Sequence, residues 1–213
     1  MGDCQISPVL IPSGILDAFW TAEETSFRGK AREYFRDGGP RQPSTAPAIP
    51  SGLGLSGRVS IFEEAARHDP RLGRDLLAWP AVSADPPPDP LESRACRLAR
   101  LAGIAAHVVE AGARAARERG SFSSSLMGCR EIQESLAGLV SGAGLVHFAA
   151  CRLCRLLEKG ERDQAGRESA LTEAKARTLA ADVRTVALSL LGESWVEANL
   201  PADDPPSDQE RTS

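Results

Sequence analysis

Apolar residues recur between positions 132 and 157 in alternating steps of four and three, and this rhythm limits the fold more than any other feature of the chain. The positions are Ile132, Leu136, Leu139, Ala143, Val146, Ala150, Leu153 and Leu157. This spacing places one stripe of side chains on a single face of a long helix. The charge-free run inside it, 135–151, is shorter than the about 20 apolar residues of a membrane span. We therefore expect a buried helix, ended by Gly160, and no membrane span.

The first helical segment is predicted near residues 21–37. Thr21 as N-cap and Glu24 form a capping box, unless the helix is already under way near residue 15. Its apolar face is expected to carry Phe27, Ala31 and Tyr34.

Three further helical segments complete the pattern, and strand patterning is almost absent. The range 58–79 is helical, with Asp69 and Pro70 restarting the helix after a bend. A long helix runs from about 92 to 119, and another carries apolar residues at 176–190 before Pro201. The sequence therefore predicts an all-α fold in which three long antiparallel helices form a bundle.

Stretches rich in proline and glycine divide the chain. The predicted parts are a helical lobe at 1–80 with a loop at 38–57, a proline-rich linker at 81–91, a helical bundle at 92–200 and a disordered tail at 201–213.

The balance of charges argues against nucleic acid as a partner. The chain has 25 lysine and arginine residues and 29 aspartate and glutamate residues, for a net charge of −4. Its first residues lack the basic start and apolar core of a secretory signal, so a cytoplasmic location is expected. Five cysteines, an odd number, are expected to be reduced thiols.

Three segments carry a resemblance to a known family. Between 119 and 137 the matching residues are Arg119, Phe122, Leu126, Ile132, Gln133, Leu136 and Ala137. In this order the chain resembles the acyl-CoA dehydrogenase family, in which an Arg-x-x-Phe-Gly turn joins two long helices of the C-terminal bundle. The segments 21–35 and 62–70 resemble that family's N-terminal helices.

The resemblance implies a flavin-dependent oxidoreductase that introduces a double bond into acyl-CoA thioesters. Family members place a β-domain, which holds the flavin, between the two helical parts. Here only 81–91 joins them. We therefore expect a chain that is inactive alone and depends on a full-length acyl-CoA dehydrogenase-like partner. FAD is expected only at the interface with that partner, and none in the isolated chain.

The resemblance also implies the residues that contact the cofactor. By position, Arg119 and Phe122 are the turn residues that approach the FAD diphosphate and adenine. Gln133 belongs to the same motif, while Arg130 replaces its first glutamine. Gly192 is the remaining glycine of the family's Gln-x-x-Gly-Gly loop, where Glu193 would repel a diphosphate unless Arg130 offsets it.

No catalytic residue is assigned. The family's usual base falls nearest Asn199, whose amide cannot accept a proton as a carboxylate does. Structural roles stay open for three of the cofactor-contact residues: Arg119 as a cation at the carbonyl end of the preceding helix, Phe122 as an apolar plug at the corner between helices, and Gln133 as a solvated first-turn residue.

Two other patterns on the 132–157 helix have structural explanations. His147, Cys151, Cys154 and Glu158 share one stripe, which could in geometry hold a metal, but buried thiols beside a satisfied histidine are favoured and no metal is predicted. Gly138 and Gly142 are expected to let two bundle helices pack closely.

Three functions remain open from the sequence. The leading one is the acyl-CoA dehydrogenase-like subunit described above. The alternative is a non-catalytic helical oligomerisation or scaffold protein, derived from the same family, whose partner is a copy of itself. The third is a flavin-free site for acyl-CoA or an acyl carrier between the lobe and the bundle.

Overall fold

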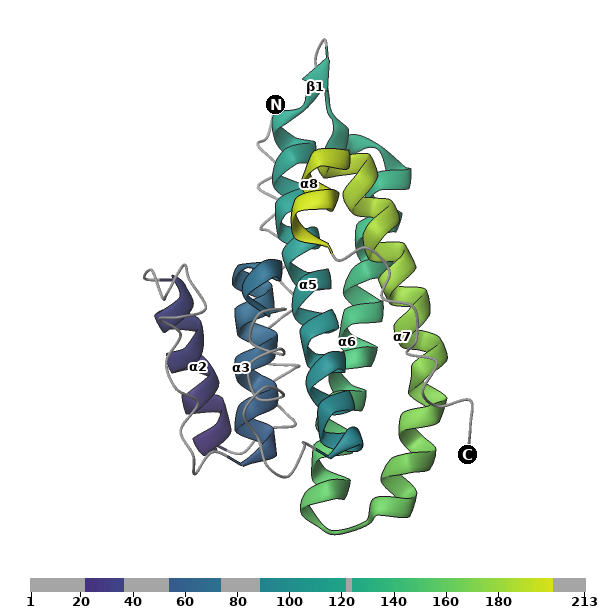
Figure 1. The fold of residues 1–213 in the computed structure, drawn as a ribbon. Coiled ribbons are helices and arrows are strands. Elements are labelled where there is room, and N and C mark those ends of the chain that lie inside the picture. Colours follow the sequence, from purple (N-terminus) through teal and green to yellow (C-terminus); the bar gives the residue numbers. More distant parts are fainter. Residues whose placement is uncertain (1–21, 37–53, 74–88, 122–123, 201–213) are drawn as a thin grey trace.

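The computed structural model describes residues 22–36, 54–73, 89–121 and 124–200. Within these ranges the chain is almost entirely helical (Figure 1). The elements are α2 (Ala22–Arg36), α3 (Leu55–His68), α5 (Pro90–Glu118), β1 (Gly120–Ser121), β2 (Ser124–Ser125), the short 3-10 helix η2 (Leu126–Gly128), α6 (Arg130–Glu158), α7 (Arg162–Leu191) and α8 (Glu193–Asn199). The predicted all-α class is confirmed.

Helices α5, α6 and α7, of 29, 29 and 30 residues, form an antiparallel bundle. Asp89 caps α5 by accepting a hydrogen bond from the N–H of Leu91 at 2.9 Å. The same carboxylate pairs with Arg162, so that α5 and α7 begin side by side. Gly160, with φ at 77°, provides the left-handed residue that ends α6.

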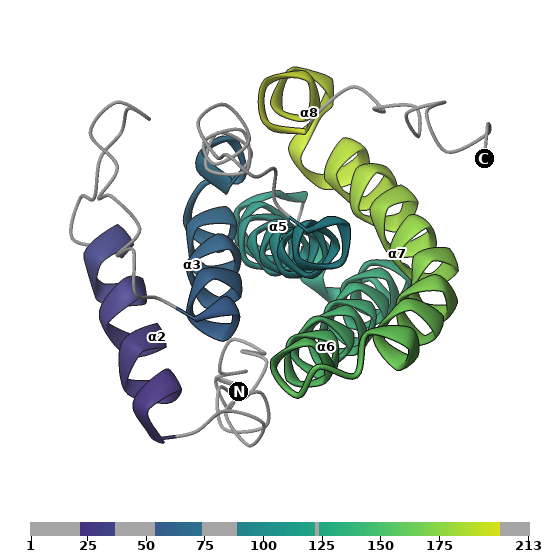
Figure 2. The ribbon, with the colours of Figure 1, turned by 60° about the horizontal axis from the view of Figure 1, so that its bottom comes forward.

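The remaining helices lie around α5. Helix α3 packs along α5 on the side away from α7, and α2 lies outside α3 (Figures 1 and 2). Helix α8 folds back from the end of α7, where the ring of Trp195 stacks on His107 with centroids 5.8 Å apart. One hydrophobic core runs through α3, α5, α6 and α7.

The predicted stripe on α6 is the buried face of that helix. Leu136, Leu139, Ala143, Val146, Ala150 and Leu153 are buried, and Ile132 and Leu157 are partly buried against the core. The stripe predicted on α7 is also buried: Ala176, Leu179, Val183, Val186 and Leu190. The 4-3 spacing thus identified the faces of both helices correctly.

Helix α6 is long and apolar enough to cross a membrane, judged by length and composition. This is weak evidence, because the core helix of a bundle passes the same test. Ten of its residues are buried among the other helices, as the sequence prediction of a buried helix requires.

The first helix ends near the predicted residue, and Ala31 of its predicted face packs against the core, but the prediction for Tyr34 is wrong. Tyr34 is 41% exposed, whereas Phe35 and Arg28 are buried. The reason is electrostatic: Arg28 hydrogen bonds with two glutamates of α3, and this fixes which side of α2 faces inward. Thr21, Glu24 and Phe27 lie outside the residues whose side chains the structure describes.

The bend predicted at Asp69 and Pro70 is confirmed. Helix α3 ends at His68, and the helix resumes at Pro70, where Asp69 Oδ1 accepts a hydrogen bond from the N–H of Arg71 at 2.8 Å. Helix α3 begins at Leu55, three residues before the predicted start and inside the predicted loop. The rest of that loop, most of the linker and the tail lie outside the described residues, so these predictions stay open.

Helices α3 and α5 approach closely at Gly103. A Cβ atom there would lie 2.2 Å from the carbonyl oxygen of Glu63 and 3.0 Å from Cβ of Ala66. Only glycine lets the two backbones meet at this distance. This contact holds the backbone of Glu63 against α5.

Candidate functional site

Four of the five predicted cofactor-contact residues lie at one end of the bundle. We call this end the bundle end. It consists of the residue that directly follows α5, strands β1 and β2, η2, the first turn of α6 and the turn between α7 and α8 (Figure 1). Arg119, Arg130, Gln133 and Gly192 belong to it, and Phe122 falls outside the described residues. The fold therefore brings together segments that are far apart in the sequence.

Arg119 follows the last residue of α5 and contacts the end of α7. Its Nη1 atom donates a hydrogen bond to the carbonyl oxygen of Leu190 at 2.9 Å. A cation is favourable at the carbonyl end of a helix. The structural role left open by the sequence placed Arg119 at the carbonyl end of the preceding helix, α5, whereas the observed acceptor is a carbonyl of α7. Contact with a diphosphate stays a prediction.

The two residues at the start of α6 are exposed and bonded locally. Gln133 Nε2 donates to the carbonyl oxygen of Met127 at 2.7 Å, which joins α6 to η2. Arg130 Nε lies 2.7 Å from Glu134 Oε1, one helical turn away. Arg130 is therefore directed along its own helix, toward Glu134.

Gly192 forms the turn between α7 and α8. Its φ of 92° lies in the left-handed region that favours glycine, and its N–H donates to Ala187 and Leu188 carbonyl oxygens at 3.1 and 3.2 Å. Glu193 follows directly and is exposed. Asn199, at the position nearest the family's base, donates from Nδ2 to the carbonyl oxygen of Trp195 at 2.8 Å.

A second constellation, which sequence reasoning missed, lies between α2, α3 and α6. We call it the polar cluster; it consists of Arg28, Arg32, Glu63, Glu64 and His147. Arg28 Nη2 lies 2.7 Å from Glu63 Oε1, and Arg28 Nε lies 2.8 Å from Glu64 Oε1. Arg32 Nη2 lies 2.8 Å from the same Glu64 oxygen. All members except Arg32 are buried.

Glu63 is the centre of the polar cluster and stays ionised. Burial by itself would raise the pKa of its carboxyl group, but Arg28 and His147 outweigh this effect and lower the pKa to about 2. Each carboxylate of the cluster has a guanidinium partner, so that the buried charges of α2 and α3 balance. The polar cluster therefore joins α2 to α3 through ion pairs.

His147 connects the polar cluster to Cys151. Its Nδ1 lies 2.7 Å from Glu63 Oε2, and its Nε2 lies 3.4 Å from Cys151 Sγ. When the ring is neutral and its proton is on Nδ1, Nδ1–H is donated to the Glu63 carboxylate and Nε2 accepts a hydrogen bond from the Cys151 thiol. The order of thiol, imidazole and carboxylate is that of a nucleophile, base and orienting acid. Burial, however, raises the pKa of the Cys151 thiol and closes it to substrates.

The stripe considered for a metal is used in other ways. His147 bonds to Glu63 and Cys151, and Glu158 bonds to Ser56. Within the four described ranges, no group of three or more histidine, cysteine, aspartate or glutamate residues is placed to hold a metal ion.

One sequence signal could have revealed the polar cluster: ionisable residues on apolar helix faces. Glu63 and Glu64 lie between Phe62 and Ala65, and His147 interrupts the charge-free run. A buried charge needs a partner of opposite sign. Spacing cannot name that partner, because Arg28 lies 35 residues from Glu63.

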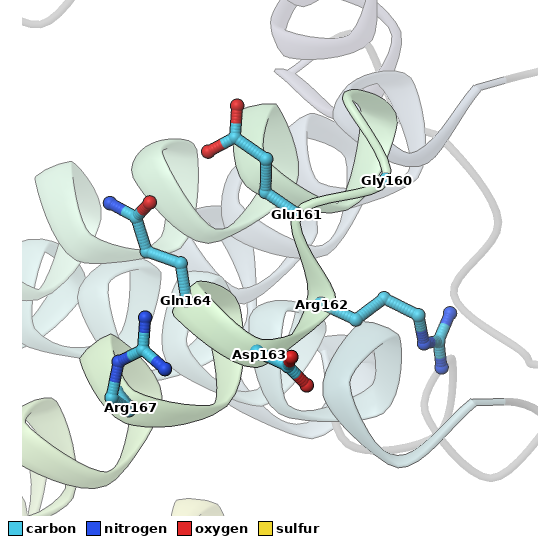
Figure 3. Close-up of a pocket in the computed structure, with 6 residues that line it drawn as sticks. All are labelled: Gly160, Glu161, Arg162, Asp163, Gln164 and Arg167. Atoms are coloured by element: carbon cyan, nitrogen blue, oxygen red, sulfur yellow. The ribbon is translucent and has the colours of Figure 1, made fainter.

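An open hollow of about 390 Å³ lies at the opposite end of the molecule, where α6 turns into α7 (Figure 3). It is lined by Gly160, Glu161, Arg162, Asp163, Gln164 and Arg167. Its two arginines and two carboxylates balance, and Arg162 pairs with Asp89 outside it. The hollow contains none of the predicted site residues.

Among the described residues, the bundle end provides hydrogen-bond donors, and the polar cluster contains buried ion pairs.

Comparison with known proteins finds no matching family model, no matching curated protein and no matching solved structure.

Proposed function

We propose that the chain is an acyl-CoA dehydrogenase-like subunit of a flavin-dependent oxidoreductase that acts on the CH–CH group of acyl-CoA thioesters. In this proposal the chain is inactive alone and works with a full-length partner. The observation that carries it is the convergence of Arg119, Arg130, Gln133 and Gly192 at the bundle end. The resemblance assigns these residues to the surroundings of the FAD diphosphate.

Arg119 is the residue best suited to reach a cofactor held by the partner. A guanidinium has five N–H donors in a planar fork, and it pairs with phosphate in two-point contacts. One donor of Arg119 goes to Leu190, which fixes the side chain at the end of the bundle. The other donors remain for a phosphate oxygen.

The partner would also supply the base that removes the α-proton. Asn199 carries no carboxylate, and its amide is bonded to Trp195 within α8. The flavin, when bound, accepts the β-hydride. This chain's own contribution is therefore limited to binding and positioning.

Flavin retention in a complex tests this proposal. The tagged chain is co-expressed with each full-length acyl-CoA dehydrogenase of its source organism, and FAD release from the purified complex is followed by flavin fluorescence. We expect Arg119→Ala to speed release, and Arg114→Ala, at an exposed arginine of α5, to leave it unchanged. A chain that captures no such partner, or a complex indifferent to Arg119→Ala, contradicts the proposal.

The second candidate is a non-catalytic helical oligomerisation or scaffold protein. Two observations favour it: Arg119 and Arg130 are already bonded within the chain, and the outer side of α6 carries a row of uncharged, exposed residues. Self-association without a flavoenzyme partner supports this candidate.

The third function left open by the sequence, a flavin-free site for acyl-CoA, has its own test. Calorimetry with acyl-CoA and no added FAD measures whether acyl-CoA is itself a ligand.

A further inference from the structure

Helix α8 is held by side chains of two segments that lie far before it in the sequence. Arg71, in the helical turn that follows the bend at Asp69, donates from Nε to the carbonyl oxygen of Ala198 at 2.8 Å. The ring of His107 on α5 stacks on the ring of Trp195, with centroids 5.8 Å apart and planes 20° from parallel. Helix α8 therefore lies against α5 near the bundle end, with its carbonyl end bonded to the segment after α3 (Figure 1).

The end of α3 also fixes the ring of His107. The Nδ1 atom of His107 lies 2.8 Å from the carbonyl oxygen of Arg67, and because a carbonyl group only accepts, Nδ1 is the donor. The guanidinium group of Arg67 pairs with Glu110, one turn further along α5. Both supports of α8 therefore depend on how residues 67–71 lie against α5.

Two apolar side chains keep α8 attached to the core. Val196 and Leu200 are both buried and belong to the hydrophobic core. Apolar burial is not directional, whereas a hydrogen bond and a ring stack have preferred geometries. The two apolar residues thus hold α8 in place, and Arg71 and His107 set its orientation.

The other end of α8 begins at the bundle end. Gly192 connects α7 to α8, and its carbonyl oxygen accepts the N–H of Val196 at 3.2 Å. Because α8 has only seven residues, about two turns, a shift at Ala198 is passed on to Gly192. Leu190, two residues before Gly192, accepts the hydrogen bond of Arg119. The orientation of α8 therefore bears on the contact that fixes Arg119.

We infer that α8 is a strap through which Arg71 and His107 position the turn at Gly192, and with it the Leu190 carbonyl that accepts from Arg119. Arg71 and His107 are positioning residues, since they act through α8. The inference rests on the proposed function, in which this turn lies beside the FAD diphosphate. It adds a route by which the segment after α3 controls how long flavin is retained.

Hydrogen exchange in the full chain, without flavin or partner, tests the coupling. Arg71→Met and, as a second variant, His107→Leu should make the amide of Gly192 exchange several-fold faster than in the wild type. Amides in the middle of α7, at 176–186, should exchange at the wild-type rate. An unchanged rate at Gly192 in both variants overturns the inference. Faster exchange along the whole of α7 also overturns it, because the variants would then loosen the fold and not the turn.

Two further variants separate positioning from a general loss of charge. Arg71→Lys should restore slow exchange at Gly192, because lysine can also donate to the Ala198 carbonyl. Arg114→Met, at an exposed arginine of α5, should exchange like the wild type. A lysine variant as fast as Arg71→Met, or an equal effect of Arg114→Met, overturns the inference.

FAD release from the complex with a full-length partner tests the consequence for the site. Arg71→Met should speed release and Arg71→Lys should restore the wild-type rate. Release that Arg119→Ala speeds and Arg71→Met leaves unchanged overturns the inference and leaves the proposed function intact. A chain that binds no such partner overturns the flavin role in both proposals, and the exchange rate of Gly192 then decides the coupling through α8 by itself.

Discussion

The Nδ1 atom of His147 on α6 lies 2.7 Å from Oε2 of Glu63 on α3, with both side chains buried. Arg28 of α2 pairs with the other oxygen of the same carboxylate. The carboxyl group of Glu63 therefore joins α2, α3 and α6, which are distant in the sequence. The attachment of α2 depends on this group, since α2 packs against α3 and presents a guanidinium to it.

Arg28→Met should lower the free energy of unfolding by roughly 3 kcal/mol or more, because breaking a buried ion pair leaves uncompensated carboxylates. Urea unfolding followed by circular dichroism measures this. Lys30→Met, at an exposed position of the same helix, should have little effect. Equal stabilities for the two variants would refute a stabilising role for the polar cluster.

Stability should fall in acid because the pKa of Glu63 is about 2 in the folded chain, against an ordinary value of 4.5. The unfolded chain takes up a proton there first, so the contribution of Glu63 is complete above about pH 4.5 and is lost as the pH falls toward 2. Glu63→Gln should be less stable at neutral pH and should show a shallower decline between these values. Glu193→Gln, at an exposed position, should keep the wild-type slope.

Two glycine substitutions should change stability in opposite directions. Gly103→Ala should lower the free energy of unfolding by roughly 2 kcal/mol, because its Cβ would collide with the Glu63 carbonyl. Gly144→Ala should raise it by up to about 1 kcal/mol, since a Cβ there would meet no described heavy atom within 4 Å and alanine favours the helix. Thermal unfolding of both variants tests the α3–α5 contact.

The cysteines should differ sharply toward iodoacetamide. Burial raises the pKa of Cys96 to about 12 and raises the pKa values of Cys151 and Cys154, so these thiols should react only after unfolding. Cys129 is exposed and should be alkylated in the native chain. A hydrogen bond to Glu131 raises its pKa, so Glu131→Gln should speed the reaction. Peptide mass spectrometry locates the modified thiols, and rapid native alkylation of Cys151 would contradict its burial.

The helices were predictable because each leaves a local periodic signal. The 4-3 spacing identified the buried faces of α6 and α7, and Asp69 with Pro70 marked a true bend. The face of α2 was only partly predictable from its apolar residues: Ala31 packs against the core, but Arg28, which bonds to two glutamates of another helix, is buried in place of Tyr34. Long-range ion pairs have no fixed sequence spacing, so periodicity cannot reveal them.

The candidate site was predictable only as a set of positions. A resemblance in the order of residues selected Arg119, Arg130, Gln133 and Gly192, and antiparallel helices bring their segments to one end. It could not indicate that Arg119 bonds to Leu190 or that Arg130 bonds to Glu134. Those contacts depend on how side chains meet after the helices have packed.

The proposed dependence on a partner is tested most directly by the flavin content of the protein, alone and in complex. The visible absorption spectrum is recorded for the purified chain after incubation with FAD and removal of the excess, and for the chain co-purified with a full-length acyl-CoA dehydrogenase. We predict no flavin absorption from the chain alone, and a complex whose FAD is released faster when Arg119 is replaced by alanine. Stoichiometric FAD in the isolated chain would contradict the proposal.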